Sequence, residues 1–174
     1  MDTNSPLKNF GFLLHDVARL LRRRMDQSAH NLGLTSAQWR VLAHVARCET
    51  LKQQPLNQAN LADLLDMEPI TLSRQIDRME AAGLIERRPD PADRRAHRLF
   101  LTDTAWPLVN SFRAVGAEVL KTALVGVSEE EVAALTDVLG RMRTNISGKP
   151  EAAEVRAATG IARSTTPVEE GRVA

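Results

Sequence analysis

Five residues near the middle of the chain combine short hydrogen-bonding side chains with arginines: Thr71, Ser73, Arg74, Gln75 and Arg78. Apolar residues alternate with them at helical spacing, which predicts one helix with a polar side. Such a face can contact base edges with its long side chains and phosphates with its charges. We expect Arg74 to bind guanine in a bidentate way and Gln75 to contact adenine. Thr71 and Ser73 are expected to contact phosphates or thymine methyl groups. An ordinary solvated helix face is the alternative.

The boundaries of this helix are marked by residues with special backbone preferences. Glu68-Pro69 predicts its start, because the missing N–H of proline costs nothing at the first helical position. Gly83 predicts its end, since glycine readily adopts the left-handed conformation that terminates helices. The residues expected to form its apolar side and its continuation are Ile70, Leu72, Ile76, Met79 and Leu84.

An arginine-rich hairpin follows the helix. Leu84–Arg88 and Arg98–Leu101 are strand-like, and Pro89-Asp90-Pro91 turns the chain between them. With the apolar-periodic segment Leu56–Leu65, the order is helix, turn, helix, hairpin. This order predicts a winged helix-turn-helix that binds duplex DNA, with its second helix in the major groove and the hairpin tip in the minor groove. The arginines of the hairpin are Arg87, Arg88, Arg94, Arg95 and Arg98. Two alternatives are a solvated hairpin and a winged-helix protein-interaction module without DNA readout.

Long amphipathic helices flank this block. One is expected over Pro6–Asn31, and two more lie between Thr104 and Ile146, where Thr102 or Thr104 caps the first. They carry more apolar surface than one module needs, which favours an intersubunit bundle in a homodimer over helices that fold back on their own core. We therefore expect the following parts: 1–33, N-terminal dimerisation helix; 34–102, DNA-binding lobe; 103–147, C-terminal dimerisation helices; and 148–174, a disordered tail.

Bulk composition fits this scheme. The chain has 174 residues, 43% hydrophobic, with 3% aromatic residues and a formal net charge of +1, so one mainly α-helical fold with an aliphatic core is expected. No apolar run approaches the roughly 18 residues that span a bilayer, and no signal peptide is evident, which predicts a cytoplasmic protein. No nucleophile elbow, phosphate loop or paired zinc motif is present, so no enzymatic activity and no cofactor are expected.

Two motifs carry a resemblance to a known family. Asp93-Arg94-Arg95 with Leu101-Thr102, and the run from Asp77 to Ile85, resemble the wing and the recognition-helix end of MarR-type regulators. The similarity extends from about Pro6 to Ile146. Leu34-Thr35 with Trp39, and Leu101-Thr102 with Ala105 and Pro107, are most similar to the SlyA-like branch, although many members have glycine where Ala105 stands.

The resemblance implies a homodimer on a pseudo-palindromic operator and, commonly, repression, while SlyA-like members also activate. It further implies that Arg94 or Arg95 enters the minor groove and that Asp93 braces the wing. Small aromatic acids bind between the dimerisation helices and the DNA-binding lobes in this family. The expected ligand residues here are Arg19, Arg22, Thr35, Trp39 and His44. Alternatively, Trp39 belongs to the core and the arginines pair with Asp16 and Asp26.

Cys48 and the histidines carry weaker predictions. Cys48 is expected near a helix C-terminus, where the helix dipole disfavours a thiolate, and there is no second cysteine for a redox pair. The four histidines, His15, His30, His44 and His97, lack the spacing of metal ligands, so no metal site is expected.

Overall fold

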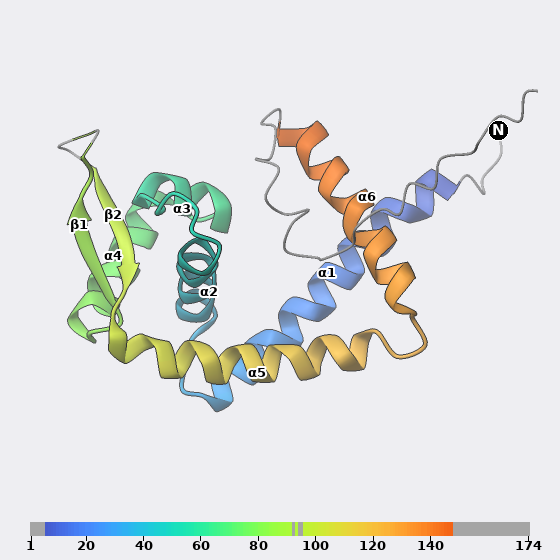
Figure 1. Cartoon of the computed structure of the whole chain (residues 1–174), viewed down its shortest axis with the longest axis horizontal. Helices are drawn as coiled ribbons and strands as arrows, with labels where there is room; N and C mark the ends of the chain where they lie inside the picture. Colours follow the sequence, from blue (N-terminus) through green and yellow to red (C-terminus); the bar gives the residue numbers. More distant parts are fainter. Residues whose placement is uncertain (1–5, 92, 94–95, 148–174) are drawn as a thin grey trace, which may run out of the picture. The chain divides into compact units, whose positions relative to one another are not determined.

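A computed structural model of the protein describes residues 6–91, 93 and 96–147. This described part contains α1 (Pro6–Asn31), α2 (Ser36–Thr50), α3 (Gln58–Leu65), α4 (Pro69–Ala81), β1 (Ile85–Pro89), β2 (His97–Leu101), a 3-10 helix at Asp103–Ala105, α5 (Trp106–Ala123) and α6 (Glu129–Ser147) (Figure 1). The mainly α fold with a small β-wing is confirmed. Among the described residues, no helix is both long and apolar enough to cross a bilayer.

The chain divides into two compact units after Ala123, so that α6 belongs to the second unit. The functional division at residues 33, 102 and 147 stays a prediction. The predicted tail, residues 148–174, lies outside the described residues.

Local chemistry sets the helix boundaries. In the capping box of α2, the Thr35 N–H donates to Gln38 Oε1 at 2.9 Å and the Gln38 N–H donates to Thr35 Oγ1 at 3.3 Å. Asn57 caps α3 by accepting from the Asn60 N–H at 2.8 Å. Pro69 is the first residue of α4, and Gly83 ends the helix with φ of 68°. These predicted boundaries are confirmed.

The start of α5 differs from the prediction. The helix begins at Trp106, with Pro107 in its first turn, and no cap is formed by the side chain of Thr102. Instead, Thr102 and Thr104 both donate through their hydroxyls to the Gly83 carbonyl oxygen. These two hydrogen bonds tie the residues after β2 to the end of α4.

A single aliphatic core holds α2, α3, α4 and the hairpin together. Its fully buried members include Val41, Leu61, Leu65, Leu72, Ile76, Met79, Ile85 and Leu99. In the antiparallel hairpin, Ile85 lies opposite Leu101 and Arg87 lies opposite Leu99. Beside the hairpin, Asn57 forms one β-bridge with Arg98, and the Leu99 N–H donates to the Leu56 carbonyl at 2.9 Å.

Candidate nucleic-acid interface

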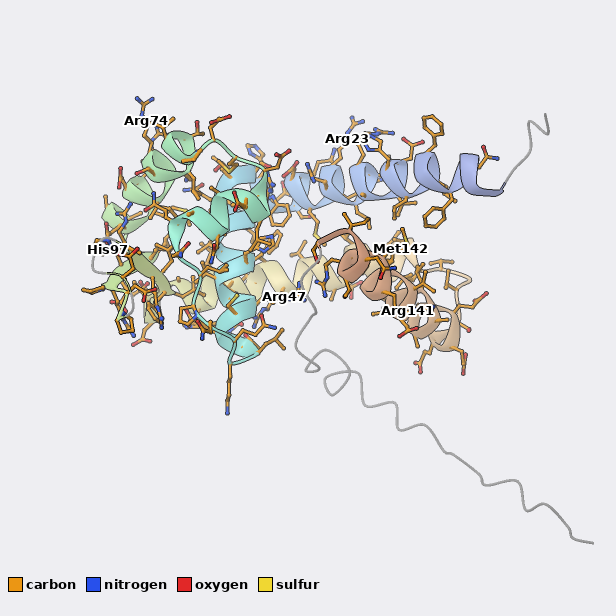
Figure 2. All side chains as sticks on the ribbon, turned by 90° about the horizontal axis from the view of Figure 1, so that it is seen from above. Arg23, Arg47, Arg74, His97, Arg141 and Met142 are labelled. Atoms are coloured by element: carbon orange, nitrogen blue, oxygen red, sulfur yellow. The ribbon has the colours of Figure 1, made fainter. Side chains whose placement is uncertain are left out.

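The core fixes which face of α4 meets solvent. Leu72, Ile76 and Met79 have no exposed surface, and each contributes about 1.5–3 kcal/mol through burial. Rotating the helix about its axis would expose these side chains. The opposite face is therefore held outward, and Arg74 projects from it, away from the neighbouring helices (Figure 2).

The five residues predicted to read DNA all lie on α4 but differ in exposure. Thr71, Arg74 and Arg78 are exposed, whereas Ser73 and Gln75 are half-buried. The structure thus brings the three exposed side chains onto one accessible surface, since residues three and four apart share a helix face. Their contacts with bases and phosphates stay predictions.

One member of the predicted apolar side does not belong there. Ile70 was expected with Leu72 and Ile76, but 66% of its surface is exposed. The reason is its place around the helix, because at about 100° per residue Ile70 lies nearly opposite Leu72 and Met79 and one turn before the exposed Arg74. The prediction that grouped Ile70 with the apolar side was therefore wrong.

Arg87 connects β1 to α4. Its Nη2 donates to Asp77 Oδ1 at 2.6 Å, its Nη1 pairs with Glu80, and its backbone N–H donates to Glu80 Oε1 at 3.3 Å. Only 16% of the Arg87 side chain is exposed. The sequence predicts Arg87 only as one of the wing arginines. Its position two residues after the buried Ile85 places it on the same side of the strand, which could have indicated an inward contact.

A second ion pair lies within the wing itself. Arg98 Nε donates to Asp90 Oδ2 at 2.8 Å and its Nη2 donates to Asp90 Oδ1 at 3.2 Å, and both residues are half-buried. This bidentate geometry fixes the base of the hairpin turn. DNA contact by Arg98 stays a prediction, and the structure shows that its guanidinium already engages a carboxylate.

The tip of the wing is only partly described. Arg94 and Arg95 lie outside the described residues. Asp93 is exposed, and its carbonyl oxygen accepts a hydrogen bond from the Ala96 N–H at 3.0 Å. Its bracing role stays a prediction. On β1, the Arg88 guanidinium lies 4.2 Å from the centroid of the Phe100 ring and pairs with Glu86.

A cavity of about 510 Å³ is lined by residues of α1, α2 and α5 and of the adjoining loops. Two of its walls are Trp39 and Phe112, whose rings stack with centroids 5.0 Å apart. The Trp39 Nε1–H donates to Asp26 Oδ1 at 2.7 Å, which joins α2 to α1. The cavity also contains two arginines, Arg47 and Arg113, and Arg113 Nη2 donates to Thr50 Oγ1 at 2.8 Å.

Of the predicted ligand residues, Trp39 alone is among those lining this cavity. Arg19 is exposed and pairs with Asp16 at 3.2 Å, Arg22 and Thr35 are exposed, and His44 is half-buried on α2. The structure therefore does not gather the five residues around that space. Arg47 and Arg113 were missed. Arg113 approaches Trp39 only because α5 packs against α2, whereas Arg47 lies two turns after Trp39 on α2 itself.

Burial shifts the pKa of His44 and the pKa of Cys48, both on α2. It lowers the pKa of His44, and the nearby cations Arg47 and Arg40 lower that pKa further. Burial raises the pKa of the Cys48 thiol. Both groups are consequently favoured in their neutral forms, since desolvation penalises charge.

Comparisons with known proteins agree with this geometry. Residues 32–96 match the model of the MarR family. The crystal structure of the transcriptional regulator PA3341 is 35% identical, covers 80% of this chain and 99% of its own, and has a TM-score of 0.70. A mutant MarR from E. coli in complex with operator DNA is 25% identical over 82% of this chain and 99% of its own, with a TM-score of 0.61.

A third structure, S. aureus MepR in its DNA-binding conformation, is 23% identical over 79% of this chain and 98% of its own, with a TM-score of 0.66, and shows the shared fold. The SlyA-like branch stays a prediction. The family match, the 35% identical regulator and the exposed face of α4 together identify a DNA-binding transcriptional regulator. The chain belongs to the MarR family.

Proposed function

We propose that this regulator binds a pseudo-palindromic operator as a homodimer, with α4 of each protomer in the major groove and its wing in the adjacent minor groove. The observation that carries the proposal is the orientation of α4, which buries Leu72 and Ile76 while Arg74 projects into solvent (Figure 2). A helix held in this way presents long cationic side chains to base edges without losing core contacts. Occupation of an operator that overlaps a promoter would repress transcription.

Within this interface Arg74 contacts guanine and Gln75 contacts adenine, while Thr71, Ser73 and Arg78 bind phosphates or neighbouring base edges. The wing supplies cations to the minor groove, whose narrow A·T tracts have enhanced negative potential. Two ion-pair contacts support this placement: Arg87 joins the hairpin to Asp77 and Glu80 of α4, and Arg98 with Asp90 fixes the hairpin itself.

The test begins with selection of bound sequences from random duplex DNA by the full chain. On the selected operator, Arg74→Ala should lose about 1–3 kcal/mol of binding free energy and should lose much less on unrelated DNA. Arg95→Ala should weaken binding evenly across sequences and flatten the salt dependence. Arg141→Ala, which removes an exposed arginine of α6 paired with Asp137, is the matched control and should change neither. Full operator affinity in both Arg74→Ala and Arg95→Ala would refute the interface.

Homodimer formation is supported by apolar side chains that are exposed to solvent in the described part of the chain. Helix α6 has no buried residue, and α1 exposes many of its large apolar side chains. A second copy would remove that surface from water. The exposed residues are Phe10, Phe12, Leu13, Leu14, Val17 and Leu20 on α1, and Leu135, Val138 and Ile146 on α6.

The dimer is tested by light scattering of the purified chain. Phe12→Asp places a charge on a side chain that is 78% exposed and should give a monomeric mass with loss of operator binding. Leu64→Asp changes an exposed leucine of α3 and should keep the dimeric mass. A monomeric mass for the unsubstituted chain would contradict the proposal.

Release from DNA by a small aromatic carboxylate is the regulatory part of the proposal. The cavity has the size of small-ligand sites, an aromatic wall at Trp39 and Phe112, and two cations, Arg47 and Arg113. An arginine binds a carboxylate through two parallel hydrogen bonds. The ring of the ligand would lie against Trp39 and its carboxylate would reach Arg47 or Arg113.

Salicylate is a suitable probe, with salicylamide as the neutral control. In a Trp106→Phe background, the remaining tryptophan fluorescence reports on Trp39, because the chain has two tryptophans. Salicylate should quench it and release operator DNA, and salicylamide should do neither. Arg113→Gln should abolish the response if the cavity is the site, whereas Arg22→Gln should abolish it if the residues expected from sequence form the site. No quenching and no release would remove the effector from the proposal.

A further inference from the structure

The exposed isoleucine at the start of the recognition helix has no role in the core. Ile70 is 66% exposed, while the other large apolar side chains of α4, Leu72, Ile76 and Met79, are fully buried. A β-branched residue also has no advantage in helix propensity over the polar residues around it. The stability of the fold therefore does not explain an isoleucine at this position.

The position of Ile70 is continuous with the face that carries the arginines. Residues four apart lie one above the other on a helix, which places Ile70 on the same side as Arg74, one turn nearer the N-terminus. In helix-turn-helix proteins, the N-terminal residues of the recognition helix are those that contact base edges. Ile70 thus adds one apolar side chain to the exposed and otherwise polar face of α4.

The chemistry of the base edges indicates which group on DNA the Ile70 side chain would contact. In the major groove, thymine is the base that displays an apolar group, its C5-methyl, whereas the other base edges display donors and acceptors. We propose that Ile70 is a specificity-determining residue that contacts the C5-methyl group of a thymine in each half-site. The inference rests on the proposed placement of α4 in the major groove.

The helix geometry also places this thymine relative to the base that Arg74 reads. Four residues of helix rise by about 6 Å, which is less than two base-pair steps of about 3.4 Å. The thymine should therefore lie within about two base pairs of the guanine bound by Arg74. Removing its methyl group should weaken binding by about fourfold for each half-site, from the free energy of burying one carbon group.

The experiment replaces single thymines of the selected operator with deoxyuridine, which removes the methyl group and keeps the base-pairing edge. Binding of each duplex is measured for the unsubstituted chain, Ile70→Ala, Thr71→Ser and Leu64→Ala. Leu64 is the matched control, because it is a 54% exposed leucine on α3 rather than on α4. Thermal unfolding should be unchanged in Ile70→Ala, since its side chain is exposed.

The unsubstituted chain should lose about fourfold per half-site at one thymine, and Ile70→Ala should bind the thymine and deoxyuridine operators equally. Leu64→Ala and Thr71→Ser should keep the full sensitivity. The inference is overturned if no thymine is sensitive, if sensitivity persists in Ile70→Ala, or if Thr71→Ser abolishes it. Those results would leave tight operator binding by the unsubstituted chain intact, whereas failure of the proposed function would appear as no selected operator at all.

Discussion

Replacing Arg87 with methionine tests whether the wing is braced against the recognition helix. Methionine retains an apolar stem of similar length, so the change mainly removes the interactions with Asp77 and Glu80. Exposed ion pairs contribute about 0.2–1 kcal/mol each. The carboxylates are exposed but the arginine is 16% exposed, so the upper half of that range applies to each pair. The expected loss in the free energy of unfolding is about 1–2 kcal/mol.

Urea denaturation of Arg87→Met, Asp77→Asn and the double variant measures this loss and the coupling between the two residues. We expect a coupling free energy of about 0.5–1 kcal/mol for the pair. Arg88→Met is the matched control on the same strand, because its side chain is 59% exposed and contacts Glu86 and the Phe100 ring rather than α4. The stability that it loses should show no coupling to Asp77. Equal losses for Arg87→Met and Arg88→Met, with no coupling to Asp77, would refute the brace.

The same variant separates positioning from direct DNA contact. If Arg87 only positions the wing, Arg87→Met should lower operator affinity without changing how steeply affinity falls with salt, because no phosphate contact is removed. A flatter salt dependence would mean that Arg87 itself contacts the DNA backbone.

Three further predictions concern the DNA-binding lobe. Because the pKa of His44 is lowered by folding, the unfolded chain binds a proton more readily than the folded chain. The free energy of unfolding should therefore decrease as the pH falls below the ordinary His pKa of 6.5. Urea titrations at several pH values should show that His44→Gln removes this part of the pH dependence. Cys48, whose pKa is raised by burial, should react with iodoacetamide at neutral pH more slowly than glutathione and should match it only in urea; equal rates in buffer would contradict its desolvation. Gly83→Ala should lower the free energy of unfolding by about 1–2 kcal/mol, because a φ of 68° strains an L-residue. Steric clash does not contribute, since no atom lies within 4 Å of the added methyl group. An unchanged midpoint of thermal unfolding would contradict this strain.

The helix boundaries and the order of elements followed from short-range chemistry. The box of Thr35 with Gln38, the Asn57 cap, Pro69 and Gly83 act within a few residues, so the sequence displays them directly. Periodicity likewise indicated the buried side of α4 through Leu72, Ile76 and Met79. Ile70 was wrongly grouped with them, because strict helical spacing places it nearly opposite Leu72 and Met79.

The sequence by itself determined that the chain forms a winged helix-turn-helix with an arginine-rich hairpin, because helix caps, turns and apolar spacing are local properties. Tertiary structure decided which arginines brace and which remain accessible. Arg87 and Arg74 are the same residue type thirteen positions apart, yet one is held by Asp77 and Glu80 and the other projects into solvent. It also decided that Arg113, rather than Arg19, lines a cavity with Trp39. Charge and burial of this kind depend on residues brought together by packing, and no spacing along the chain specifies them.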